Sequence, residues 1–311
     1  MEIQIVSGFL GAGKTTFLNK YLPLLDGNTV VIENEFGDVG LDGELIQEDF
    51  PVKELYAGCI CCSLALDFQK GIKELAEQFH PDRIVIEPSG VGRLTDVVKA
   101  CGRAKEKEGI DLRITKLIVI LDITEFEDYI DGFGAFYLDQ IQNAGLILLS
   151  NLEQVSKEEK NRLISEIREV NPDAVIYEDD WRKMEGAALL ELLDMSEDYE
   201  NDPEDDMEEI MMSPASADKI FSSMSIENAR EMTAHELEKA LYGLKDEKYG
   251  KVLRAKGIVK AGGGRVLHFD FTPSIVEVAD ISDTVKGTKV DKIIIIGCNL
   301  NETAIWELFS I

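Results

Sequence analysis

Positive charge is scarce in this sequence, and long apolar runs are missing. Its 311 residues include 32 lysines and arginines but 60 aspartates and glutamates, a formal net charge of -28. Such an acidic surface repels phosphate backbones and anionic lipids, so we expect neither nucleic acid nor a membrane as a partner. No apolar stretch is long enough to span a bilayer. Met1 leads almost directly into an apolar stretch without the pattern of a secretory leader, so we expect a cytoplasmic protein.

Cysteine is also scarce, and it is unevenly placed. Of the five cysteines, Cys59, Cys61 and Cys62 crowd together, whereas Cys101 and Cys298 stand alone. An odd number with one tight cluster does not match the disulfide framework of a small secreted protein. In a reducing compartment, such a cluster more often binds a metal or takes part in redox chemistry.

Short β-branched runs alternate with amphipathic stretches over residues 1–193. This alternation predicts an α/β domain with a mainly parallel sheet covered by helices. Several of the runs are almost wholly apolar, as expected for strands that are buried on both faces. Strands are expected at residues 3–7, 29–32, 52–56, 83–86, 114–121, 146–149 and 174–177, and helices at residues 14–25, 64–79, 95–100 and 156–170.

The composition changes after residue 193. Acidic residues dominate residues 194–209. A run of like charge repels itself and is not easily buried, so residues 194–218 are predicted to be an acidic linker. Residues 219–311 mix strand and helix patterns and are predicted to form a smaller α+β domain. Strands are expected at residues 219–225, 253–260, 265–271 and 291–296, and helices at residues 233–242 and 302–309.

A phosphate-binding loop follows the first predicted strand. Residues 8–15 read GFLGAGKT, the complete Gly-x4-Gly-Lys-Thr pattern, between a strand and a helix. In such a loop the backbone N–H groups turn inward around a β-phosphate, at a helix N-terminus that favours anions. Lys14 is expected to bridge the β- and γ-phosphates and Thr15 to ligate Mg²⁺. The predicted nucleotide-binding residues of the loop are Gly8, Gly11, Ala12, Gly13, Lys14, Thr15 and Thr16.

A carboxylate at the end of a neighbouring strand is needed to complete the magnesium site. Glu87 ends the run at residues 83–86, and the backbone N–H of Gly90 shortly after it can donate to a γ-phosphate. Asp122 is the rival, because it ends another apolar run. Its alternative role is to cap the helical segment that follows it. We predict Lys14 and Glu87 as catalytic residues, with Glu87 also at the magnesium ion.

The loop after the strand at residues 29–32 is rich in carboxylates. Glu35, Asp38 and Asp42 are interspersed there with glycines. In parallel α/β sheets, ligands collect at the carboxyl ends of the strands, which is where this loop lies. The three carboxylates could ligate Mg²⁺, orient a water molecule or complete a metal site, and Asp42 is our candidate catalytic residue among them. An ordinary solvated loop is the alternative.

The three clustered cysteines lie between the predicted strand at residues 52–56 and the helix at residues 64–79. Thiolates near a helix N-terminus have a lowered pKa, which favours metal binding and redox reactivity alike. Thiolates suit Zn²⁺, Cu⁺ and similar metals, but Cys59, Cys61 and Cys62 need a further ligand for a tetrahedral site. Water, Glu35 or a partner protein can supply it. The alternative is that one or two of the cysteines are merely small buried residues.

Several motifs together resemble those of the CobW-type P-loop GTPases, relatives of the nickel-insertion GTPases for urease and hydrogenase. They are GFLGAGKTT at residues 8–16, NEFG at 34–37, GCICC at 58–62, EPSG at 87–90, RAKG at 254–257 and IGCNL at 296–300. The resemblance implies a GTP-dependent metallochaperone with Mg²⁺ and with Zn²⁺ or Co²⁺ on Cys59, Cys61 and Cys62. It further implies low basal hydrolysis coupled to delivery, a client metalloprotein or cofactor-maturation protein, and a possible homodimer.

The segment that recognises the base departs from this family. The family reads guanine with Asn-Lys-x-Asp after a strand, whereas residues 150–153 read SNLE. Aligned through residues 155–156, Glu153 takes the place of the aspartate and Asn151 that of the lysine. Glu153 can still accept from guanine, but its extra methylene displaces the carboxylate unless the loop shifts. A hydrolase that uses ATP or does not discriminate, and a sensing adaptor with little turnover, remain alternatives.

Overall fold

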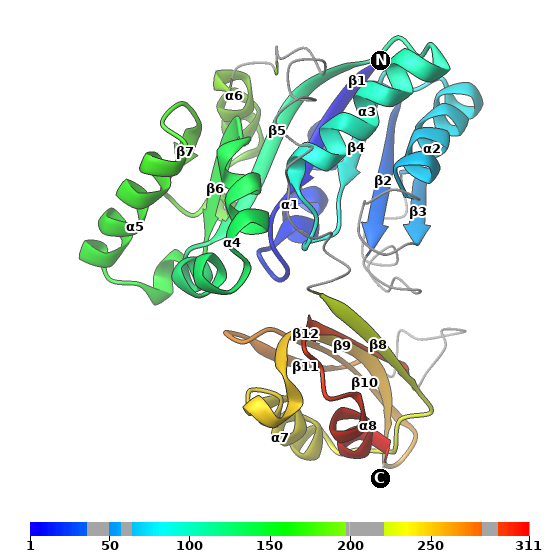
Figure 1. Ribbon diagram of the computed structural model, residues 1–311, viewed down its shortest axis with the longest axis vertical. Helices are drawn as coiled ribbons and strands as arrows, with labels where there is room; N and C mark the ends of the chain where they lie inside the picture. Colours follow the sequence, from blue (N-terminus) through cyan, green and yellow to red (C-terminus); the bar gives the residue numbers. More distant parts are fainter. Residues whose placement is uncertain (36–49, 57–63, 197–198, 200–220, 282–291, 311) are drawn as a thin grey trace. The chain divides into compact units, whose positions relative to one another are not determined.

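The computed structural model describes residues 1–35, 50–56, 64–196, 199, 221–281 and 292–310. The chain divides into two compact units, Met1–Ala217 and Asp218–Ile311 (Figure 1). The predicted acidic linker falls largely outside the described residues. Within the described ranges, no helix is both long enough and apolar enough to cross a membrane.

The first unit is built on a seven-stranded sheet with the order β3-β2-β4-β1-β5-β6-β7. Every neighbouring pair is parallel, which confirms the predicted α/β class. The strand that leads into the glycine loop, β1, lies between β4 and β5 and is therefore buried on both sides. The strands are β1 (Glu2–Ser7), β2 (Thr29–Glu35), β3 (Val52–Tyr56), β4 (Arg83–Glu87), β5 (Arg113–Asp122), β6 (Leu146–Ser150) and β7 (Val175–Tyr177).

Helices cover this sheet. α2, α3, α4 and α5 pack against one another in that order, and α1 packs against α6. The side chains of α1 and α6 join one apolar core with alternate residues of the central strands. The helices are α1 (Lys14–Tyr21), α2 (Leu64–Phe79), α3 (Leu94–Glu108), α4 (Phe126–Gln142), α5 (Lys157–Val170) and α6 (Gly186–Met195). No residue range was predicted for α4 or α6, and α3 is longer than the segment expected at residues 95–100.

The second unit is an antiparallel sheet with the order β11-β10-β9-β12-β8. α7 and α8 bury their apolar side chains with one face of this sheet, which confirms the predicted α+β class. Thr233 and Glu236 form the expected capping box at the start of α7. The elements are β8 (Ser222–Glu227), α7 (Ala234–Gly243), β9 (Lys251–Ala261), β10 (Arg265–Phe271), β11 (Val276–Asp280), β12 (Lys292–Cys298) and α8 (Glu302–Ser310). Only β11 was not predicted.

Candidate nucleotide site

The glycine loop connects the end of β1 to the start of α1. Gly8, Gly11 and Gly13 all have positive φ angles, of 147°, 78° and 105°. A Cβ on Gly8 would collide with the carbonyl oxygen of Ile120 on β5, so only glycine lets the chain leave β1 at this point. Gly13 precedes α1 in a left-handed conformation and offers no side-chain cap. The first N–H groups of α1 are thus left for an anion.

Lys14, Thr15 and Glu87 come together at this loop. The Lys14 side chain is only 6% exposed, and its Nζ donates to the carbonyl oxygen of Phe9 over 3.4 Å. Because β4 pairs with β1, Glu87 faces the first turn of α1. Its Oε1 lies 4.0 Å from Lys14 Nζ and accepts from Thr15 Oγ1 over 3.4 Å. The carboxylate of Glu87 therefore lies beside both the buried ammonium of Lys14 and the hydroxyl of Thr15.

The segment after β4 also touches the glycine loop. A Cβ on Gly90 would lie 2.8 Å from the backbone nitrogen of Leu10, so the backbone at Gly90 lies directly against the loop. Gln140 of α4 holds this segment, because its Nε2 donates to the carbonyl oxygens of Gly92 (2.7 Å) and Gly90 (3.5 Å). Gln140 and the glycine loop thus hold the backbone at the predicted residue Gly90 between them.

Two serine hydroxyls next to these segments are buried. Ser7 directly precedes Gly8, and Ser89 directly precedes Gly90. Neither Oγ has a hydrogen-bond partner among the residues that the structure describes. Buried polar groups are nearly always bonded in folded proteins. Each of these hydroxyls therefore has a hydrogen bond available for a water molecule or a ligand.

Asp122 has the structural role of a cap. Its Oδ1 accepts from the backbone N of Thr124 over 3.0 Å and from Thr124 Oγ1 over 2.7 Å, which starts the 3₁₀ turn Ile123–Glu125. Its Oδ2 accepts from Asn151 Nδ2 over 2.7 Å. Burial raises the pKa of Asp122 above its ordinary value, and these hydrogen bonds offset only part of that rise. Of the two predicted roles, the capping role is the one that the geometry supports.

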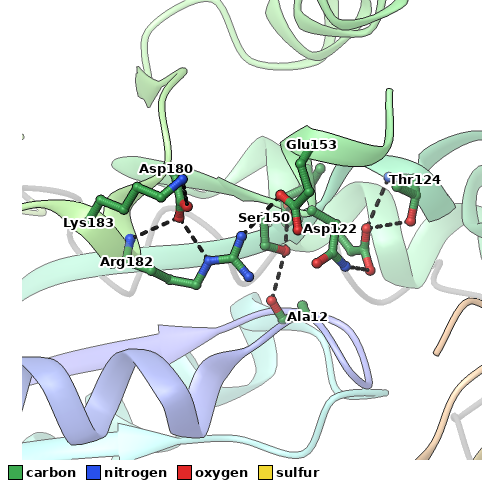
Figure 2. Close-up of polar contacts among 10 residues, drawn as sticks. Ala12, Asp122, Thr124, Ser150, Glu153, Asp180, Arg182 and Lys183 are labelled. Atoms are coloured by element: carbon green, nitrogen blue, oxygen red, sulfur yellow. Dashed lines mark hydrogen bonds and ion pairs between the residues drawn. The ribbon is translucent and has the colours of Figure 1, made fainter. Parts of the chain in front are cut away.

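Ser150, rather than Asn151, connects the predicted base segment to the glycine loop. Ser150 Oγ donates to the carbonyl oxygen of Ala12 over 2.9 Å (Figure 2). Asn151 follows in a left-handed conformation, with a φ of 57°, and its amide is directed to Asp122. Glu153 lies on the short 3₁₀ turn Leu152–Gln154, and its carboxylate is largely exposed. Ser150 was not among the predicted site residues, although it occupies the first position of the altered motif.

The segment after β7 lies beside the same loop. Trp181 is buried against Phe17 of α1, with ring centroids 5.6 Å apart, and its ring is 3.8 Å from where a Cβ of Gly13 would be. Lys20 Nζ donates to the carbonyl oxygen of Arg182 over 2.7 Å. Arg182 Nη2 lies 3.2 Å from Glu153 Oε2 (Figure 2). No local sequence signal identifies Arg182, because this contact is made only by the tertiary fold.

Phe9 of the glycine loop is packed into an aromatic cluster on α4. Its ring centroid lies 4.4 Å from that of Tyr129, 5.1 Å from that of Phe133 and 5.7 Å from that of Tyr137. Burial raises the pKa of Tyr129 and of Tyr137 well above the ordinary tyrosine value, so both phenols stay neutral. The cluster therefore fixes one end of the loop through apolar packing.

Most of the residues predicted for the transition metal or within the carboxylate-rich loop lie outside the described residues. These are Cys59, Cys61 and Cys62, together with Asp38 and Asp42. The backbone of Glu35 ends β2, but nothing is described of its side chain. Among the described residues, no group of three or more histidines, cysteines, aspartates and glutamates is arranged to hold a metal ion. The roles predicted for these residues therefore stay predictions.

Two parts of the chain match known protein families. Residues 2–178 match the family described as CobW/HypB/UreG, nucleotide-binding domain, and residues 221–310 match the cobalamin synthesis protein cobW C-terminal domain. The zinc chaperone YeiR of Escherichia coli (strain K12) is 31% identical over 189 residues, which cover 60% of this chain and 57% of YeiR.

Other similar proteins carry related names. The zinc-regulated GTPase metalloprotein activator 1 of Dictyostelium discoideum is 25% identical over 211 residues, which cover 56% of this chain and 44% of that protein. The chain thus spans about half the length of these two relatives. Among solved structures, the Zn(II)-bound YjiA GTPase from E. coli aligns with a TM-score of 0.45 and 23% identity, over 99% of this chain and 97% of that chain.

Proposed function

The chain belongs to the CobW/HypB/UreG family of nucleotide-binding proteins, and from this premise we propose that it is a GTP-dependent metallochaperone. It would bind a transition metal, with zinc favoured by the names of its relatives, and hand it to a client metalloprotein or cofactor-maturation protein in the cytoplasm. The observation that carries the proposal is the meeting of Lys14, Thr15 and Glu87 at a glycine loop that opens a helix.

The glycine loop is proposed to hold the triphosphate. Its backbone N–H groups and the open first turn of α1 would bind the phosphate oxygens, with Lys14 placed to neutralise the β- and γ-phosphates. Because Lys14 is buried, its charge is screened little by water and acts strongly on a nearby phosphate. Gly90, which abuts the loop, is proposed to donate its N–H to the γ-phosphate and so to respond to its loss.

Thr15 and Glu87 are proposed to hold a magnesium ion. A hydroxyl and a carboxylate are the hard oxygen ligands that Mg²⁺ prefers. We propose that the buried hydroxyls of Ser7 and Ser89 bind water molecules around the ion. When bound, the ion neutralises charge on the phosphate oxygens. Asp42 remains our candidate for orienting the attacking water.

The transported metal is proposed to bind at Cys59, Cys61 and Cys62, with Glu35 as a further ligand. The parallel register of β2 and β3 sets the backbone of Glu35 opposite Tyr56, shortly before the cysteines. β2 also pairs with β4, with Glu33 opposite Glu87. β3, which leads to the cysteines, and β4, which ends at Glu87, are thus the two neighbours of β2, and this arrangement supports a coupling of nucleotide state to metal binding.

The nucleotide part of the proposal is tested by hydrolysis of GTP and ATP in parallel. Each is measured with Mg²⁺, with and without Zn²⁺ or Co²⁺, for the unmodified chain and for Lys14→Ala. We expect slow hydrolysis that falls roughly a hundredfold or more in Lys14→Ala, and no change in Lys105→Ala, whose side chain is exposed on α3. Turnover that does not depend on Lys14 would contradict the proposal that this chain hydrolyses the nucleotide. Nucleotide binding without turnover would favour the alternative of a sensing adaptor.

The metal part is tested separately by titration with Co²⁺, whose thiolate complexes absorb visible light. Replacing both Cys61 and Cys62 with serine should abolish tight thiolate binding, because serine is a poor ligand for these metals. Cys298→Ser is the control, since this half-buried thiol lies on β12 of the second unit. Unchanged stoichiometry in the double variant would show that the cluster is structural.

A further inference from the structure

Two segments that are distant in sequence meet beside the glycine loop. The first ends β6 and is joined to the loop by the Ser150 hydroxyl on the carbonyl of Ala12. The second follows β7 and is joined to α1 by Lys20 on the carbonyl of Arg182. Trp181 packs beneath the loop at Gly13. Both segments are therefore fixed relative to the place where the phosphates would bind, and under the proposed function the base of the nucleotide lies beside the first of them.

Arg182 bridges these two segments. Its Nη2 lies 3.2 Å from Glu153 Oε2, and its Nε donates to Asp180 Oδ1 over 2.8 Å (Figure 2). Asp180 Oδ1 also accepts from the backbone N of Arg182 over 3.1 Å, and its Oδ2 lies 3.1 Å from Lys183 Nζ. The guanidinium is thus fixed on one side by Asp180 and presents its other side to Glu153.

Stability does not explain this arrangement. The side chains of Arg182 and Glu153 are 37% and 60% exposed, and exposed ion pairs contribute little to stability. The ion pair has a larger effect on the position of the Glu153 carboxylate, because a glutamate has one more side-chain torsion than an aspartate. A carboxylate held by a fixed guanidinium loses that extra freedom.

We propose that Arg182 determines the choice of purine base by fixing the Glu153 carboxylate at the edge of the base. Guanine presents two donors, N1–H and the 2-amino group, which a fixed carboxylate can accept together. Adenine presents a lone pair at N1 and no 2-amino group, so the same carboxylate disfavours it. The inference deepens the proposed function and rests on it, and it makes the chain selective for guanine despite Asn151 at the usual lysine position.

Equilibrium binding of GDP, ADP and XDP to the full chain tests this role, with Mg²⁺ and isothermal titration calorimetry. We expect GDP to bind at least roughly tenfold more tightly than ADP. Arg182→Ala should lower this ratio about threefold to tenfold by weakening GDP alone, and Arg182→Lys should restore part of it. Glu153→Gln should shift the preference from GDP toward XDP, since the amide can donate to the 2-oxo group.

A double variant and a matched control sharpen the result. Adding Arg182→Ala to Glu153→Gln should change little further, because the arginine is proposed to act through the carboxylate. Arg162→Ala is the control, because Arg162 is a similarly exposed arginine whose ion pairs are with Glu127 of α4 and with Glu166 of its own helix. If Arg182→Ala destabilises the chain, as judged by its melting temperature, Arg182→Gln keeps a side chain of related shape and replaces it.

The outcomes separate this inference from the function it rests on. An equal change of GDP and ADP affinity in the Arg182 variants, or an unchanged ratio, would overturn the role of Arg182 while leaving the metallochaperone proposal intact. Undiminished binding of both nucleotides in Lys14→Ala would instead overturn the phosphate site itself.

Discussion

Ser150 is a small side chain that joins the end of a strand to the glycine loop. It is buried, and its hydroxyl donates to the carbonyl of Ala12 and lies 3.4 Å from that of Leu121. Removing the hydroxyl leaves a buried carbonyl without this donor. A lost buried hydrogen bond costs about 1–2 kcal/mol of unfolding free energy.

We therefore expect Ser150→Ala to lower the free energy of unfolding by about 1–2 kcal/mol, measured by urea denaturation and Trp181 fluorescence in a Trp306→Phe background. Ser165→Ala is the matched control, because Ser165 Oγ also donates to a backbone carbonyl, that of Asn161, but on the exposed surface of α5. The control should lose only about 0.5 kcal/mol or less. Equal losses in the two variants would show that the contact with Ala12 has no special value.

At the residue scale, the sequence can predict what has a local signal. Lys14 and Thr15 belong to a contiguous motif, and Glu87 ends a strand whose apolar pattern is plain, so the sequence could predict that all three lie at the glycine loop, where the structure brings them together. The bond of Ser150 to Ala12 joins residues 138 positions apart. The contact of Arg182 with Glu153 likewise depends on how β6 and β7 pair. No spacing of residue types along the chain predicts either contact.

α3 and α4 share charged groups where they pack. Arg93 at the N-cap of α3 has no side-chain cap contact, and Asp139 of α4 takes that role by accepting from the backbone N (3.1 Å) and Oγ1 (2.7 Å) of Thr95. Asp96 lies in the same first turn. Burial, and then the nearby charge of Asp139, raise the pKa of Asp96 to about 6. Arg93 and other basic groups lower it in part.

This interface predicts a dependence of stability on pH. Because the folded pKa of Asp96 is above its ordinary value of 3.8, the folded state holds the proton more tightly than the unfolded state. Its contribution to stability is therefore full at low pH, falls as the pH rises from about 4 to about 6, and stays low above that. Asp96→Asn removes the titration and should gain about 1–3 kcal/mol over the unmodified chain at neutral pH.

Unfolding of both chains by urea between pH 4 and pH 7 measures this difference. The gain of Asp96→Asn should grow with pH and should be small at the acidic end. A difference that does not change with pH would contradict the raised pKa. Asp173→Asn, at an exposed site after α5, controls for the loss of one negative charge.

At the element scale, strands were easier to predict than helices. Strands such as β1 and β6 are short apolar runs with clear ends. α4 was missed because glycines at positions 132 and 134 weaken its helical signal, and Gly134 indeed has non-helical angles inside the helix. α3 extends past Gly102, which is buried in its interior and was not expected to lie within a helix.

The two compact units each contain one tryptophan. Trp181 is buried in the first unit, whereas Trp306 is 48% exposed on α8 of the second. We expect two unfolding transitions in calorimetry, and Trp306→Phe identifies the transition of the first unit by its remaining fluorescence. GDP with Mg²⁺ at a hundred times its dissociation constant should stabilise that transition by about 2.7 kcal/mol.

The midpoint temperature of the second unit's transition should not change when GDP and Mg²⁺ are added. One joint transition that shifts as a whole would show that the units unfold together, and nucleotide effects on the second unit alone would contradict the placement of the site.

The sequence could identify both fold classes, because the strand patterns differ between the two parts. No periodic pattern in residues 36–49 and 57–63 predicts where Cys59, Cys61 and Cys62 lie relative to Glu35.

The close approach of Gly8 to Ile120 has a consequence for selection. A side chain at position 8 would strike a backbone carbonyl of a central strand, whether or not a nucleotide is ever bound. In a library of random variants sorted only for folded, abundant protein, position 8 should therefore be as intolerant as in one sorted for hydrolysis. Position 14 should be intolerant in the second library alone. Comparison of the two libraries would separate the positions that are needed for folding from those that are needed for hydrolysis.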